Sequence, residues 1–99
     1  MSVRLEVIYW RDIPAQVMAR EGRDIHRHEL PARFQEAIDR AATRAGKTAT
    51  DDYLGEWRKE RWEVEGSAGE AASARAVEID ERFTDDVLAR YVANAGRKP

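Results

Sequence analysis

The chain has 99 residues, with a hydrophobic fraction of 42% and a charged fraction of 36%. This allows one domain with a modest core under a heavily charged surface and is too short for two ordinary domains. The formal net charge of −2 argues against general binding to nucleic acids. The lack of cysteine excludes disulfides and thiol chemistry, and no apolar run is long enough for a secretory signal or a membrane span. We therefore expect a cytosolic protein.

Two strands are predicted at the start of the chain. Residues 3–10 alternate, with Val3, Leu5 and Val7 on one face, and are rich in β-branched and aromatic side chains, which is typical of a strand. The segment RDIP at 11–14 is suited to a turn. Residues 15–22 then form a second strand that pairs antiparallel with the first and ends at Gly22.

Residues 31–45 give the strongest helical signal. Pro31 suits the first helical position, where no backbone N–H is needed, and Phe34 and Ile38 begin a narrow apolar stripe. Gly46 follows as the expected C-cap. We predict that this helix packs on the sheet, because an isolated hairpin is only marginally stable.

The second half of the chain gives mixed signals. Thr50 before two aspartates predicts the capped start of a short helix through about Arg58. Residues 60–66 fit a third strand, although a helix continuing to Arg61 fits almost as well. Helical spacing recurs from Ala72, and Thr84 predicts the cap of a last helix over 85–95.

Together these elements predict a two-layer α+β fold. A small antiparallel sheet of two or three strands would pack against three or four helices. Residues 1–95 would form a single domain, and residues 96–99 a disordered tail.

A basic cluster is the best candidate for a binding site. Four arginines and two histidines fall within fourteen residues, and arginine recognises phosphates and carboxylates through two parallel hydrogen bonds. The helix starting at Pro31 would add the positive end of its dipole. The alternative is a solvated face neutralised by nearby carboxylates. The cluster comprises Arg20, Arg23, His26, Arg27, His28 and Arg33.

Metal binding and catalysis have weaker support. His26 and His28 would share one side of a strand near Asp24 and Glu29, but the sequence has no third histidine. Surface histidines are therefore the simpler interpretation, and we expect no metal or other cofactor. No phosphate-binding loop, nucleophile elbow or zinc-protease motif occurs. An enzyme using His26 with a carboxylate stays a minor hypothesis.

Trp57 lies beside Arg58, Lys59 and Arg61, so it could form a stacking platform for nucleotides. Packing at the edge of the core is the alternative for Trp57 and also for Trp10. Three tryptophans in 99 residues make the exposure of at least one of them a reasonable expectation.

Residues 7–58 resemble the bacterial virulence factor domain family. The resemblance rests on VIYWRDIPAQV at 7–17, GR at 22–23, LPARFQEAIDRAA at 30–42 and YLGEWR at 53–58. Longer relatives, the conserved virulence factor C proteins, carry this domain beside an iron–sulfur-scaffold-like domain and helical repeats. The resemblance implies an accessory or regulatory protein, supplies no catalytic residue, and draws attention to Trp10, Arg11, Asp12 and Gln16. These residues form either a binding loop or a turn that hydrogen-bonds itself.

The sequence therefore favours a non-catalytic module that docks on a larger cytosolic enzyme or scaffold protein. The main alternative is a binder of an anionic ligand, either a nucleotide cofactor or RNA, through Arg20, Arg23 and Arg27 with Trp57.

Overall fold

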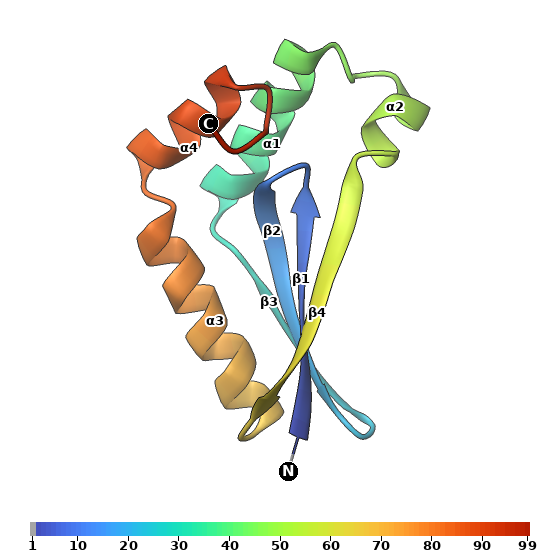
Figure 1. Ribbon diagram of the computed structural model, residues 1–99, viewed down its shortest axis with the longest axis vertical. Helices are drawn as coiled ribbons and strands as arrows, with labels where there is room; N and C mark the ends of the chain where they lie inside the picture. The colour runs from blue at the N-terminus through green and yellow to red at the C-terminus, as the bar shows by residue number, and fades with distance from the viewer. Residues whose placement is uncertain (1) are drawn as a thin grey trace.

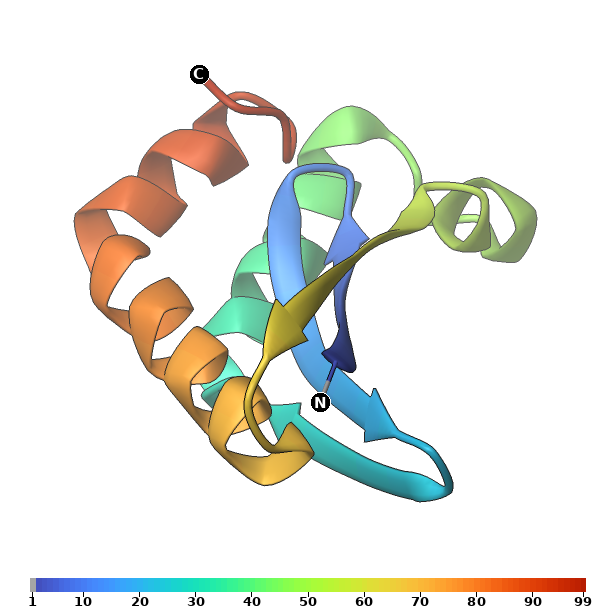
Figure 2. The same ribbon diagram turned by 60° about the horizontal axis from the view of Figure 1, so that its bottom comes forward.

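A computed structural model describes residues 2–99 and shows a two-layer α+β architecture (Figure 1). Four strands form one antiparallel sheet in the order β3-β2-β1-β4. Helix α3 packs across β1, β2 and β3, while α1 packs on β2 and on α4 (Figures 1 and 2). The elements in chain order are β1 (Ser2–Trp10), β2 (Ile13–Glu21), β3 (Asp24–Glu29), α1 (Ala32–Ala45), α2 (Thr50–Leu54), β4 (Trp57–Glu65), α3 (Ala68–Arg82) and α4 (Asp85–Ala93).

The core lies between the sheet and the helices. Alternate residues of β1 and β2 point toward α3, and the facing side of α3 is lined mainly by alanines, which let the helix approach the sheet closely. Phe34 and Ile38 of α1 are fully buried at the upper end of the same core. The central strand residues of this core are Val3, Leu5, Val7, Val17 and Ala19.

The α+β class and the two layers are as predicted, but the sheet has four strands instead of two or three. Residues 60–65 belong to β4, so the strand interpretation of this segment is confirmed. Strand β3 was not predicted. All six of its residues are exposed, so it lacks the alternation of apolar and polar side chains that marks a half-buried strand.

The predicted helix boundaries are partly confirmed. Gly46 ends α1 with φ 71°, and the Thr84 hydroxyl accepts a hydrogen bond from the Val87 N–H at the start of α4. The predicted cap at Thr50 is wrong: Ala49 holds the N-cap position of α2 and no side chain caps it. This helix ends at Leu54 rather than near Arg58, because β4 begins at Trp57.

The C-terminal residues 96–99, expected to be a disordered tail, lie against the turn between β1 and β2. The Asp12 N–H donates to the Gly96 carbonyl at 2.9 Å, and the Lys98 N–H donates to the Asp12 carboxylate at 2.7 Å. These two hydrogen bonds attach the C-terminal segment to the turn. Within residues 2–99, no helix is both long and apolar enough to cross a membrane.

Candidate functional site

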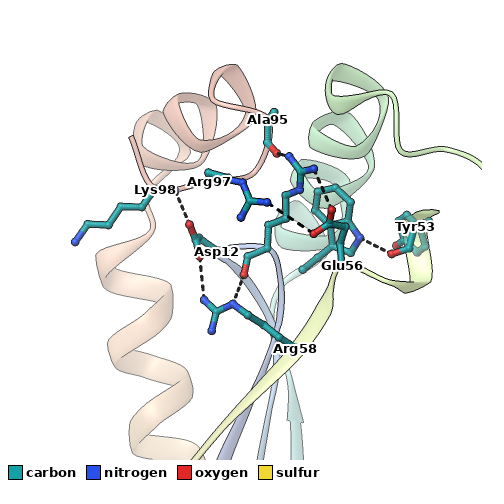
Figure 3. Close-up of polar contacts among 9 residues, drawn as sticks. Asp12, Tyr53, Glu56, Arg58, Ala95, Arg97 and Lys98 are labelled. Atoms are coloured by element: carbon teal, nitrogen blue, oxygen red, sulfur yellow. Dashed lines mark hydrogen bonds and ion pairs between the residues drawn. The ribbon is translucent and has the colours of Figure 1, made fainter. Parts of the chain in front are cut away.

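The turn between β1 and β2 is bonded to distant parts of the chain. Trp10 is fully buried and its indole N–H donates to the Tyr53 carbonyl at 2.9 Å. Arg11 donates to the Ala95 carbonyl at 3.0 Å and to the Glu56 carboxylate at 3.1 Å (Figure 3). The turn therefore joins the start of β4, helix α2 and the C-terminal segment.

Asp12 and Arg58 complete this network. Arg58 donates to the Asp12 carboxylate at 3.0 Å and to the Arg11 carbonyl at 2.6 Å (Figure 3). The turn at residues 10–12 thus hydrogen-bonds to other segments of the chain and not to itself. The ring of Trp10 has no exposed surface for a partner, and the side chain of Arg11 is only 10% exposed.

The basic cluster predicted from the sequence is divided by the alternation of the strands. His26 and His28 lie opposite Ala19 and Val17, both buried, so the two imidazoles are on the side of the sheet that faces α3. Arg27 lies between them in sequence and therefore points to the other side. Among residues 2–99, no group of three or more histidine, aspartate or glutamate side chains is placed so that it could hold a metal ion.

Arg23 and Arg33 are also separated from the rest of the cluster. Arg23 lies in the exposed turn between β2 and β3. Arg33 reaches from α1 to α3, where it donates to the Asp80 carbonyl at 3.0 Å, to the Asp80 carboxylate and to the Phe83 carbonyl. Its guanidinium also stacks on Phe34, 4.6 Å from the ring centroid. Arg33 is therefore a helix-to-helix connector.

The remaining predicted site residues meet on the side of the sheet that faces away from α3, which we call the open face. Gln16, Arg20, Arg27 and Trp57 all lie there, as the register and alternation of the strands require. The other residues of this face were not identified from the sequence. On β1 they are the residues that alternate with the buried Val3, Leu5 and Val7. The open face also carries Arg4, Glu6, Ile8, Met18, Ile25, Glu29, Lys59, Arg61 and Glu63.

The open face contains two adjoining hollows. The smaller, of about 220 Å³, is lined by charged residues from β1, β2 and β4 around Met18. The larger, of about 480 Å³, lies at the upper end between the sheet and the start of α1, where Ile8, Gln16 and Trp57 meet Gln35. Charged and apolar groups are thus presented side by side.

The open face carries five basic residues beside the carboxylates Glu6, Glu29 and Glu63, and one of the five forms an ion pair within residues 2–99. Arg61 donates to Glu6 at 2.6 Å, and Glu6 is only 5% exposed. The other four basic residues have no carboxylate within 4.0 Å among residues 2–99. These four, all exposed, are Arg4, Arg20, Arg27 and Lys59.

A third hollow, the depression of about 410 Å³ between β1, β4, α3 and α4, lies outside the open face. Four of its charged groups form two ion pairs, Arg58 with Glu60 at 2.7 Å and Arg75 with Glu78 at 2.9 Å. Arg82 and Lys98, which also line it, have no carboxylate within 4.0 Å among residues 2–99. Burial raises the pKa of the Tyr9 hydroxyl that lines it, so this phenol stays protonated and neutral at physiological pH. The depression presents less unsatisfied charge than the open face.

The fold and this surface define a small two-layer α+β domain in which one face of the sheet carries exposed, unpaired cations. The chain belongs to the Virulence factor family, whose family model matches residues 8–92. The match extends well beyond residue 58, where the resemblance seen in the sequence ended. Comparisons with curated proteins and with solved structures found no match.

Proposed function

We propose that the protein is a non-catalytic accessory or regulatory module that docks on a larger cytosolic protein through its open face. The observation that carries the proposal is the composition of this face. Ile25 is 40% exposed on it, Met18, Ile8 and Trp57 are partly exposed, and the four unpaired cations surround them.

This mixture is typical of protein interfaces. Interfaces bury apolar anchors at their centre and are enriched in aromatic residues, methionine and arginine. Met18 supports this role because its flexible thioether adapts to a partner's shape. Trp57 supports it because tryptophan, where it is desolvated, contributes strongly to binding.

The alternative of a nucleotide or RNA ligand has less support. Stacking platforms for bases use several aromatic side chains along a groove. On the open face Trp57 lies at one end of the edge strand β4, while the central strands present Arg4, Glu6, Ile8, Gln16, Met18 and Arg20. A protein surface that offers both carboxylates and aliphatic side chains complements this pattern better.

The proposal is tested by site-specific photo-crosslinking in cells of the source organism. A photoreactive residue replaces Met18 on the open face in one variant and Val77 in another. Val77 is 53% exposed on α3, on the opposite side of the sheet, and serves as the matched control. We expect one discrete adduct from position 18 that is absent from position 77.

The captured protein is then identified and its complex reconstituted from purified components. Binding should weaken when Met18→Asp is introduced and stay unchanged with Val77→Asp. Equal adducts from both positions, or none from position 18, would contradict docking through the open face.

A further inference from the structure

Two arginines lie directly opposite each other on the two central strands of the open face, near the start of β1 and the end of β2. The register of β1 and β2 pairs Arg4 with Arg20, and opposed side chains of an antiparallel pair are close neighbours. Like charges in such a pair destabilise the sheet. The pair is therefore unfavourable for folding alone.

The surroundings offset the charge of this pair only on one side, because Glu63 lies opposite Arg4 whereas Arg20 has the apolar Ile25 opposite it on β3. Neither arginine has a carboxylate within 4.0 Å among the described residues. Glu63, which lies opposite Arg4 on β4, accepts a hydrogen bond from the Ser2 hydroxyl at 3.0 Å. The nearest acidic group on β1, Glu6, is bound to Arg61.

From this we infer that the open face binds an acidic segment of the partner protein, with a carboxylate of that segment held between Arg4 and Arg20. The inference rests on the proposed function and adds the chemistry of the partner. A carboxylate can accept hydrogen bonds from both guanidinium groups, which would convert a repulsive pair into a bridged one.

The neighbouring side chains extend the same complementarity. Arg27 on β3 lies opposite Met18, one row of side chains from the arginine pair, and Lys59 on β4 lies opposite Ile8, two rows from it. Met18 and Ile8 lie between them, so the favoured segment alternates acidic and aliphatic side chains. A phosphate backbone would match the cations but would leave these apolar groups without partners.

The variant Arg20→Glu separates this role from a structural one. It places a carboxylate opposite Arg4 and so replaces a repulsive cross-strand pair by an attractive one. We expect the midpoint of urea unfolding to rise while binding of an acidic peptide falls by at least about tenfold. If Arg20 served only the fold, its replacement would lower stability instead.

The test uses the full chain and fluorescence anisotropy with three labelled probes. The probes are a peptide alternating glutamate and leucine, the same peptide with glutamine for glutamate, and an oligothymidylate of equal length. We expect the acidic peptide to bind, the glutamine peptide to bind much more weakly, and amide NMR shifts to map to β1 and β2. Arg90→Glu, an exposed change on α4 with the same effect on net charge, should leave binding within about twofold.

Three results would overturn the inference: no binding of the acidic peptide, equal loss with Arg20→Glu and Arg90→Glu, or tighter binding of the oligothymidylate. The last would identify a nucleic acid as the ligand of the face. The outcome is separable from that of the proposed function. A specific partner crosslinked from position 18 without peptide binding defeats only the acidic-segment inference. Peptide binding without a crosslinked partner contradicts the docking proposal, and with it the partner protein as the source of the segment, while the preference of the face for acidic peptides stands.

Discussion

The backbone of Gly96 lies directly against the indole ring of Trp10. A Cβ atom added to Gly96 would be 2.9 Å from Cζ3 and 3.2 Å from Cε3 of that ring, and its φ angle is +89°. The residue thus meets two requirements that only glycine satisfies. The contact closes the C-terminal segment over a tryptophan in the core.

Gly96→Ala is therefore expected to destabilise the protein. The added methyl group would push against the buried ring, and a side chain would be strained at this φ angle, so we expect a loss of about 2–4 kcal/mol in the free energy of unfolding. Urea denaturation followed by tryptophan fluorescence measures this loss.

Gly22→Ala is the matched control for the backbone effect. Gly22 has φ +59° and no atom within 4 Å of an added Cβ, so its replacement should cost only the conformational strain of about 1–2 kcal/mol. Equal losses in the two variants would show that contact with Trp10 contributes nothing at Gly96.

The ion pair of Arg11 with Glu56 makes stability depend on pH. The hydrogen bond from Arg11 lowers the pKa of the Glu56 carboxyl below its usual value of 4.5. A lowered pKa in the folded state means that the carboxylate stabilises the protein above its unfolded-state pKa. This contribution disappears as the pH falls through the folded-state pKa.

We expect Glu56→Gln to lower the free energy of unfolding at neutral pH by about 0.5–1.5 kcal/mol. The difference from the wild type should shrink toward zero as the pH falls below about 4. Urea denaturation of both proteins, from neutral pH to below about pH 4, measures this difference in the free energy of unfolding. Glu81→Gln, at an exposed position with no basic partner within 4.0 Å among residues 2–99, should show no such convergence.

The sequence predicts the fold where one face of an element is buried. The alternation of Val3, Leu5 and Val7 and the stripe of Phe34 and Ile38 both reflect contact with the core. Strand β3 lies at the edge of the sheet beside α3, but all six of its residues stay exposed and its pairing with β2 is made by backbone bonds. Those bonds are independent of side-chain identity, so its sequence carried no signal.

The candidate site was harder to predict because closeness in sequence differs from closeness in space. His26 and Arg27 are neighbours in the chain, yet strand alternation places them on opposite sides of the sheet. Arg4 lies sixteen positions before Arg20 in the sequence but lies opposite it on the adjacent strand. The register that brings them together depends on the turn at Arg11, whose φ of 52° is unusual for a residue with a side chain.

Arg33 provides the sharpest test of how the predicted basic cluster is divided. Its guanidinium bonds to Asp80 and Phe83 and joins α1 to α3, so it takes no part in the open face. Its side chain is 28% exposed, which leaves the charge-assisted bonds partly shielded from water. Its loss should therefore affect the stability of the fold without affecting binding.

We expect Arg33→Ala to lower the free energy of unfolding by about 1–3 kcal/mol, since it removes charge-assisted hydrogen bonds between two helices. Arg40→Ala, an exposed change on the same helix, should stay within about 0.5 kcal/mol of the wild type. Urea denaturation measures both, and anisotropy with the acidic peptide should give the wild-type affinity for folded Arg33→Ala. This is the reverse of the result expected for Arg20→Glu, which gains stability and loses binding. A loss of peptide affinity with Arg33→Ala would mean that the helical side also contributes to the binding surface.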